Sequence, residues 1–223
     1  MSVLLQQFAR APVPGRVKTR MQPALSPSEA CALHEQLVLW TTRSLLQAQL
    51  GAVELWTAGG VDHALFQQCL TEGVSRLCAQ QGVDLGERMQ HALTAGLQKA
   101  GRVVLVGSDC PWINSAYLSL AVQALERDDI VLGPALDGGF VLIAVRCALR
   151  RALFDGVNWG TDTVLEETLA RAAEAGYSTA LLPPLQDIDR PDDLAAWRAL
   201  RAAASGSGGG GGSGALGFFG TDP

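Results

Sequence analysis

The stretch "RVVLVGS" (102–108) is the most strand-like run of the chain. Val103, Val104, Leu105 and Val106 follow one another with no polar residue between them. Half-exposed strands alternate apolar and polar side chains, whereas a strand that is buried on both faces has a continuous, β-branched run. The stretch therefore predicts the central strand of a parallel sheet.

Strand-like and helix-like runs alternate on both sides of this strand. The helix expected at 26–49 has a clear start, because Ser26 is a preferred N-cap and Glu29 completes a capping box. Strand–helix alternation requires crossover connections, so we expect a single α/β domain with a mostly parallel sheet flanked by helices. Further strands are predicted at 3–9, 52–58, 74–80, 129–135, 140–146 and 178–184, and further helices at 62–72, 85–100, 114–127, 161–176 and 191–203.

Length and composition suit one such domain. The chain has 223 residues, and its 48% hydrophobic and 17% charged content is what a well-buried sheet needs. The Gly/Ser-rich segment 205–223 cannot bury enough surface to offset the entropy of ordering it. We therefore expect one domain over residues 1–204 and a flexible tail over 205–223.

Composition also disfavours several classes of protein. No apolar run reaches the roughly 18–20 residues of a membrane span, and the N-terminus lacks the apolar region of a signal peptide, so we expect a cytoplasmic protein without a membrane span. The net charge of −5 argues against nucleic-acid binding. The five cysteines are scattered without a CxxC pair, which disfavours structural zinc and indicates reduced thiols.

Ligands of such sheets bind beyond the carboxyl ends of the strands, and several predicted strand ends here carry charged clusters. The first cluster is "FARAPVPGRVKTR" (8–20), which holds four cations and no acid. Its glycine lets the backbone approach a ligand, and its cations and backbone N–H groups suit a di- or triphosphate. The pattern is neither a P-loop nor a dinucleotide fingerprint. An ordinary solvated basic turn is the alternative interpretation.

Carboxylates follow two other predicted strands. Asp109 comes directly after the buried strand, where a carboxylate is costly unless it is paired or binds a cation. Mg²⁺ takes carboxylate oxygens together with substrate phosphate oxygens, although Asp109 could instead cap the next helix. In "DIDRPDDL" (187–194), Asp187 and Asp189 alternate along an extended segment, so only one of them readily faces a given metal ion.

Other side chains leave alternatives open. The sequence Asp137-Gly138 in "LDGGF" (136–140) is a strong hairpin signal, yet the second glycine leaves space for a substrate. Cys110 follows a carboxylate, which raises the pKa of a thiol, so we expect no thiolate nucleophile. Trp112 and Trp159 either line a pocket or pack in the core. The three histidines are isolated on predicted helices and form no catalytic set; they are His34, His63 and His91.

Six motifs resemble, in order and spacing, those of a family of small bacterial proteins. The family is that of the selenodomain-associated or arsenosugar-biosynthesis-type glycosyltransferases. These are similar to nucleotide-diphospho-sugar transferases with the GT-A (Rossmann-like) fold and, more distantly, to the molybdenum-cofactor and 2-phospholactate nucleotidyltransferases. The motifs, which lie between Val3 and about Leu200, are "FARAPVPGRVKTR", "QGVDLGERM", "LVGSDCPW", "LGPALDGGFVLI", "NWGTDTVLEETL" and "LLPPLQDIDRPDDL".

The resemblance implies a GT-A fold, a divalent metal cofactor (Mg²⁺ or Mn²⁺) and a set of site residues, among which Lys18 and Asp109 would be catalytic. The chain departs from many members at Phe140 and Gly160, where they carry Tyr and Ser. The matching positions are Gly15, Arg16, Lys18 and Arg20 for the phosphate loop; Gln80, Gly82 and Arg88 for the segment near the nucleotide base; Asp109 and Asp189 for the metal; and Asp137, Gly138 and Gly139 for the acceptor side.

The resulting interpretation is a metal-dependent transferase that uses an activated nucleotide. The family name favours a glycosyltransferase that acts on an NDP-sugar and a small-molecule acceptor. The dense basic loop favours the alternative, a nucleotidyltransferase in which a phosphorylated acceptor attacks an NTP and releases pyrophosphate. A third possibility is a nucleotide-binding module without catalysis, against which the presence of both Asp109 and Asp189 argues.

Overall fold

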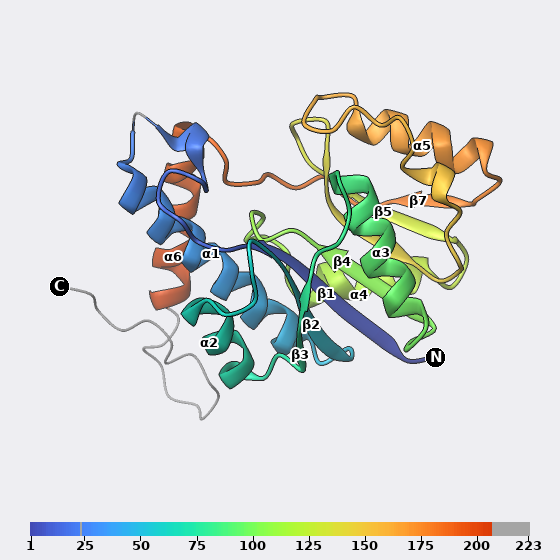
Figure 1. The fold of residues 1–223 in the computed structure, drawn as a ribbon, viewed down its shortest axis with the longest axis horizontal. Coiled ribbons are helices and arrows are strands. Elements are labelled where there is room, and N and C mark those ends of the chain that lie inside the picture. The colour runs from blue at the N-terminus through green and yellow to red at the C-terminus, as the bar shows by residue number, and fades with distance from the viewer. Residues whose placement is uncertain (23, 207–223) are drawn as a thin grey trace.

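The computed structural model describes residues 1–22 and 24–206, and within them seven strands form one sheet in the order β3-β2-β1-β4-β6-β5-β7 (Figure 1). The predicted central strand is β4, which lies fourth of the seven and is buried along Val103–Val106. The prediction is confirmed. The strands span Val3–Arg10 (β1), Ala52–Ala58 (β2), Arg76–Ala79 (β3), Arg102–Val106 (β4), Ile130–Pro134 (β5), Phe140–Val145 (β6) and Thr179–Leu181 (β7).

The sheet is mostly parallel, as expected. β1 pairs in parallel with β2 and β4, β2 with β3, and β5 with β7. β6 is the exception, because it runs antiparallel to both β4 and β5. The connection from β5 to β6 is a short hairpin, and a connection of that length can join only antiparallel strands.

The six predicted helices are present within the described residues, with ends shifted by a few residues. The capping box of the first is confirmed, since Ser26 Oγ accepts from Glu29 N and Glu29 Oε2 accepts from Ser26 N. Three 3-10 helices were not predicted. The helices span Pro27–Ala48 (α1), Ala64–Glu72 (α2), Leu85–Leu97 (α3), Ser115–Ala124 (α4), Val164–Glu174 (α5) and Leu194–Gly206 (α6), and the 3-10 helices Thr19–Met21 (η1), Arg151–Leu153 (η2) and Pro191–Asp193 (η3).

Helices cover both faces of the sheet (Figure 1). α1, α2 and α4 bury one face around Phe66 and Leu118, whereas α3 and α5 bury the other around Leu93 and Leu132. α6 packs beside α1, where the rings of Trp40 and Trp197 lie 5.2 Å apart edge to face. None of the helices described is long and apolar enough to cross a membrane.

The last helix extends into the segment predicted to be a flexible tail. α6 continues to Gly206 and so includes the first two residues of the segment assigned to the tail. The rest of that segment, 207–223, lies outside the described residues.

A long segment carries the chain from β7 to α6 across the carboxyl end of the sheet (Figure 1). We call residues 182–190 the crossing segment. Leu185 forms a parallel bridge with Ala135, and the Ile188 amide donates to the Asp109 carbonyl oxygen at 2.8 Å. Ile188 is fully buried. The crossing segment therefore brings Asp187 and Asp189 to the end of β4, from which they are far in sequence.

Candidate active site

A cleft of about 390 Å³ opens at the carboxyl ends of β1, β2 and β4. Its lining combines cations, carboxylates and aromatic rings, as a charged organic ligand would require. The charged residues in the lining are Arg10, Arg20, Arg88, Asp109 and Asp137, and the aromatic ones are Phe8, Phe140 and Trp159.

Lys18 lies at the edge of this cleft, between the two carboxylates assigned to the metal. Its Nζ is 2.8 Å from Asp109 Oδ1 and 3.7 Å from Asp189 Oδ1, and it donates to the Ile188 carbonyl oxygen. The Lys18 side chain is only 3% exposed. Its backbone has a φ of +50°, a left-handed conformation that is uncommon for lysine, where η1 begins. The structure thus brings these three residues together, but the ammonium group is not among the groups that line the cleft.

Arg20 completes the charged cluster. Its guanidinium group donates to Asp189 Oδ2 at 2.9 Å, and its side chain is 56% exposed and lines the cleft. Asp189 is therefore shared between Arg20 and Lys18, and Lys18 is shared between Asp189 and Asp109. The four charged groups therefore alternate in the order Asp109, Lys18, Asp189 and Arg20. The Arg20 end of this row lines the cleft.

The outer part of the basic loop lies away from the cleft lining. Gly15 and Arg16 are exposed, and neither contributes to the walls of the cleft. Gly15 has a φ of +77° and no atom near its missing side chain, so the turn itself requires the glycine. The loop is anchored by the buried side chains of Val17 and Met21. Of the four cations in "FARAPVPGRVKTR", Arg10 and Arg20 line the open cleft, whereas Arg16 and Lys18 do not.

The segment expected near the base contributes Gln80 and Arg88 to the cleft. The side-chain amide of Gln80 donates to the carbonyl oxygens of Trp56 (2.9 Å) and Ala9 (3.4 Å), which ties it to the ends of β2 and β1. Arg88 Nε donates to the Gly82 carbonyl oxygen at 3.2 Å. A Cβ on Gly82 would lie 2.7 Å from the Arg88 backbone nitrogen, so Gly82 permits close packing on α3.

The acceptor-side residues form both a hairpin and part of the cleft. Asp137 Oδ1 accepts from the Gly139 amide at 3.0 Å, and both residues line the cleft. Gly138 packs elsewhere, because a Cβ there would lie 2.1 Å from the Asp162 carbonyl oxygen. The Gly138 carbonyl accepts from Leu165 N at 3.0 Å and so satisfies a free amide at the start of α5. The two interpretations of "LDGGF" therefore both apply, to different residues.

Aromatic residues form one wall of the cleft. Trp159 lines it and packs edge to face on Phe140, with the ring centres 6.5 Å apart, and against Phe154 at 6.1 Å. Trp112 instead packs against the core. Gly160, where many similar proteins carry serine, lines the cleft beside them with a φ of +85°.

Three polar residues of the site were not assigned a role from the sequence. His34 lines the cleft with its Nε2 2.9 Å from the Arg10 carbonyl oxygen, and burial lowers its pKa. Ser108 Oγ donates to the Phe8 carbonyl oxygen at 2.7 Å and so ties β4 to β1. Burial and then the nearby carboxylate of Asp137 raise the pKa of Asp187 to about 6. The sequence held no signal for the first two, since a lone histidine and a lone serine have no diagnostic spacing.

Cys110 is excluded as a nucleophile, as predicted. The pKa of its thiol is raised to about 12, chiefly by burial. The neighbouring Asp109 carboxylate, on which the prediction was based, is a lesser cause. A thiolate therefore does not form at neutral pH.

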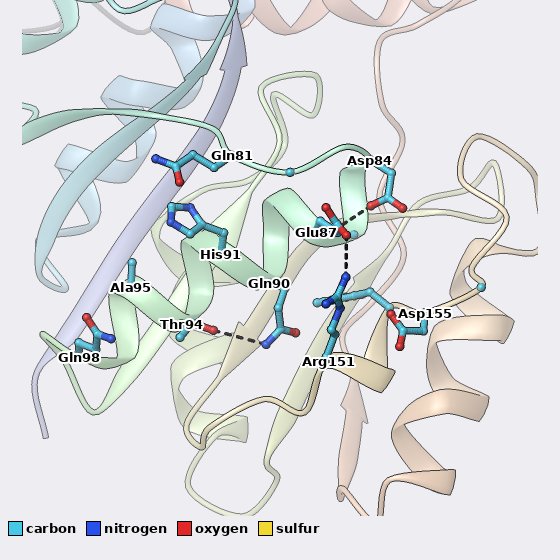
Figure 2. A pocket seen from close by; sticks show the side chains of 14 residues that line it. Gln81, Asp84, Glu87, Gln90, His91, Thr94, Ala95, Gln98, Arg151 and Asp155 are labelled. Carbon is cyan, nitrogen blue, oxygen red and sulfur yellow. Dashed lines mark hydrogen bonds and ion pairs between the residues drawn. The ribbon is translucent and has the colours of Figure 1, made fainter.

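A second and larger cavity, of about 600 Å³, lies on the other side of α3 (Figure 2). Arg151 reaches into it, but its guanidinium group is paired with Glu87 at 2.9 Å. Gly82 lines this cavity rather than the cleft. The cavity lacks the alternating cluster of Lys18, Asp109 and Asp189, so we place the candidate chemistry in the smaller cleft.

The carboxylates fit a divalent cation only in part. Asp109 Oδ1 is buried and makes no directed hydrogen bond among the described residues, although Lys18 Nζ is 2.8 Å away. Within the described residues no group of three His, Cys, Asp or Glu side chains is placed to hold a metal ion. Two carboxylates completed by substrate phosphate oxygens are the usual arrangement for Mg²⁺ in nucleotide sites. The residues therefore fit a metal–nucleotide complex better than a free ion.

Comparisons with known proteins identify the family. Residues 41–161, over half of the chain, match the family described as "Uncharacterized protein conserved in bacteria (DUF2064)". The chain belongs to this family. The selenodomain-associated or arsenosugar-type subfamily stays a prediction.

A solved structure gives the family a close structural counterpart. This protein, from Desulfovibrio desulfuricans G20, is described as a candidate nucleotide-diphospho-sugar transferase. It is 31% identical to the chain, with a TM-score of 0.75 over 85% of this chain and 84% of that one. A nucleotidyl transferase from Methanothermobacter, 16% identical with a TM-score of 0.61, covers 90% of this chain and 99% of that one. It shows the same fold. The fold predicted from the sequence is thus confirmed.

Curated relatives carry a nucleotidyltransferase name. The 2-phospho-L-lactate guanylyltransferase of Methanothermobacter thermautotrophicus is 24% identical over 180 residues, which is 79% of this chain and 76% of that protein. Its namesake from Methanopyrus kandleri is 33% identical over 98 residues, 42% of this chain and 48% of that protein. The family member described here is therefore nucleotidyltransferase-like.

The burial of Lys18 makes a prediction about stability. Lys18→Met should lower the free energy of unfolding by about 1–2 kcal/mol, because it leaves two carboxylates without their shared cation. The expected loss is below the ~3–5 kcal/mol of a fully buried pair, since Asp109 is 48% exposed. Urea unfolding measures it. Arg16→Met, on the same loop but exposed, should change the value by less than about 0.5 kcal/mol; equal losses in both variants would show that the Lys18 ion pairs are not stabilising.

Proposed function

We propose that the protein is a nucleotidyltransferase that transfers a nucleoside monophosphate from a nucleoside triphosphate to a phosphorylated small molecule. The observation that carries the proposal is the cluster of Lys18, Arg20, Asp109 and Asp189 beside a cleft lined by three arginine residues. The names of the guanylyltransferase relatives support it. It replaces glycosyl transfer, the first choice from the sequence, as the leading function.

The reaction requires little from the protein beyond positioning and charge. A phosphate oxygen of the acceptor attacks the α-phosphorus of the triphosphate, and the bond from that phosphorus to the bridging oxygen of the β-phosphate breaks. Pyrophosphate leaves with the electron pair of that bond. A phosphate monoester is already ionised near pH 7, so the nucleophile needs no general base. This agrees with a site whose nearest histidine, His34, is buried and held by a backbone carbonyl.

The cations of the cleft would stabilise the charge that develops on the pyrophosphate. Arg20 is exposed and lines the cleft. Arg10 is the last residue of β1, and Arg88 lies on α3. Guanidinium groups bind phosphate oxygens in a bidentate way and remain charged at all relevant pH values. Fixed cations in a cleft that excludes water supply much of the catalysis in phosphoryl transfer.

A divalent cation has a place in this proposal. Asp109 and Asp189 would hold it together with the triphosphate. Bound there, it would neutralise phosphate charge and make the α-phosphorus a better electrophile.

Glycosyl transfer from an NDP-sugar is the second candidate. The structure from Desulfovibrio desulfuricans, described as a candidate nucleotide-diphospho-sugar transferase, supports it. The same cations would then stabilise a departing nucleoside diphosphate. The two reactions differ in the leaving group, and hence in which nucleotide should bind best.

Nucleotide affinity should therefore rise with the number of phosphates. We expect calorimetric titration in the presence of Mg²⁺ to give GTP or CTP about 10-fold or more tighter binding than the diphosphate, with the monophosphate weaker still. A charge-assisted phosphate contact is worth roughly 1.5–3 kcal/mol, or about one to two decades in affinity. Tighter binding of an NDP-sugar than of every nucleoside triphosphate would favour glycosyl transfer instead. No binding of any of these nucleotides would contradict both functions.

A further inference from the structure

Lys18 occupies the position in which a divalent cation would meet its protein ligands. Its Nζ is in contact with three oxygens, those of the Asp109 and Asp189 carboxylates and of the Ile188 carbonyl. The ammonium group donates to the Ile188 carbonyl and forms ion pairs with both carboxylates. The same carboxylate oxygens cannot be ligands of a metal ion while the ammonium group lies between them.

We propose that Lys18 excludes a free divalent cation from the site, so that the metal enters only together with the nucleotide. The proposal rests on the proposed function, because it assigns Asp109 and Asp189 to the metal of a metal–nucleotide complex. It makes Lys18 a positioning residue that determines the order of binding.

Charge is the first reason. Among the ion-paired residues, Lys18 and Arg20 balance Asp109 and Asp189, and the carboxylates of Asp187 and Asp193 also interact with Lys18. A bare divalent cation would have to approach the buried ammonium group of Lys18 closely, and like charges repel each other. A triphosphate brings about four negative charges, and its oxygens offer Lys18 and Arg20 a replacement for the carboxylates.

Local structure is the second reason. The backbone on either side of Lys18 is anchored by the buried side chains of Val17 and Met21. The loop therefore need not move when the ammonium group leaves the carboxylates. A lysine side chain has four rotatable bonds and can swing toward a phosphate while its backbone stays in place. Asp109, which Lys18 contacts, itself lines the cleft, so the ammonium group lies beside the space that a nucleotide would occupy.

Binding of Mn²⁺ to the nucleotide-free protein tests the proposal, with the loss of the free Mn²⁺ signal in electron paramagnetic resonance as the readout. Lys18→Met should bind Mn²⁺ about 5- to 150-fold more tightly than wild type, the range typical of coupling between two sites. Arg16→Met removes a cation from the same loop and should bind Mn²⁺ as wild type does. Adding Asp109→Asn to Lys18→Met should abolish the gain.

Two results would overturn the proposal. One is equal Mn²⁺ affinity in wild type and Lys18→Met; the other is a gain that survives Asp109→Asn. If Lys18→Met does not fold, Lys18→Gln takes its place in the Mn²⁺ titration. The wild type also decides the question by itself. Tight Mn²⁺ binding by the nucleotide-free wild type, if Asp109→Asn abolishes it, is incompatible with exclusion.

Failure of the proposed function is separable from failure of this inference. The Mn²⁺ titrations contain no nucleotide, so their outcome does not depend on which base the cleft accepts. Calorimetry of wild type with GTP and with CTP in the presence of Mg²⁺ supplies the other arm. Absence of nucleotide binding there would contradict the nucleotidyltransferase proposal, whereas the Mn²⁺ comparison alone determines whether Lys18 keeps a cation from Asp109.

Discussion

Asp109→Asn is expected to lower the rate of nucleotidyl transfer by about 100- to 1000-fold at saturating Mg²⁺. The change keeps the shape of the side chain and removes the charge that would bind the metal and pair with Lys18. Loss of one preorganised electrostatic contact to a developing charge has effects of about this size. Pyrophosphate release from a triphosphate and a phosphorylated acceptor measures the rate.

A folded variant is essential for this result. Asp109 is 48% exposed in its side chain, so the neutral amide should be accommodated and the melting temperature should fall by only a few degrees. Asp192→Asn is the matched control, because Asp192 is an exposed acid in the first turn of the final helical segment. It should keep the wild-type rate. An Asp109→Asn protein with most of its activity would remove Asp109 from the machinery.

Gly138→Ala is expected to destabilise the protein by about 2–4 kcal/mol. The new Cβ would lie 2.1 Å from the Asp162 carbonyl oxygen, and the backbone φ of +91° disfavours any L side chain. The atoms that the new Cβ would meet all belong to the Asp162 backbone, which cannot move aside as a flexible side chain can, so the hairpin and the segment before α5 would have to separate. Urea unfolding measures the loss, and transfer activity should fall with it because Asp137 and Gly139 line the cleft.

Two nearby glycines separate the causes of that loss. Gly160 has a φ of +85° but open space around its Cβ position, so Gly160→Ala should show only the backbone cost of about 1–2 kcal/mol. At Gly139 the nearest obstacle is the Asp137 side chain at 3.3 Å, which can move, so Gly139→Ala should lose less than about 1 kcal/mol. A loss at Gly138 no larger than at Gly160 would show that the contact with Asp162 is unimportant.

Much of the fold could be read from the sequence because its signals are local. The continuous run at 102–108 reflects burial on both faces of β4, and the capping box of Ser26 and Glu29 involves residues three apart. Helix ends were less predictable. α5 begins at Val164 rather than near 161, since Thr161 Oγ1 donates to the Asn158 carbonyl oxygen at 2.8 Å and holds a turn there.

The candidate site was predictable where the sheet topology determines it. Lys18 follows β1 and Asp109 follows the neighbouring strand β4, so their meeting could be expected, whereas Asp189 follows β7, three positions away, and reaches them through the crossing segment. Their contacts could not be predicted. The burial of Lys18 depends on the crossing segment, whose path from β7 to α6 places the Ile188 carbonyl against its ammonium group. The contact between Gly138 and Asp162 is likewise long-range, and no local pattern records it.

Phosphorus NMR of a complete reaction tests the central proposal most directly. The protein would be incubated with Mg²⁺, GTP or CTP, and 2-phospho-L-lactate, the compound for which the relatives are named. Nucleotidyl transfer predicts pyrophosphate and, in equal amount, a new diphosphate-linked product whose two phosphorus atoms couple to each other. Asp109→Asn should form neither at a comparable rate. Intact triphosphate in every mixture, together with release of a nucleoside diphosphate from an NDP-sugar, would contradict the proposal and assign the cleft to glycosyl transfer.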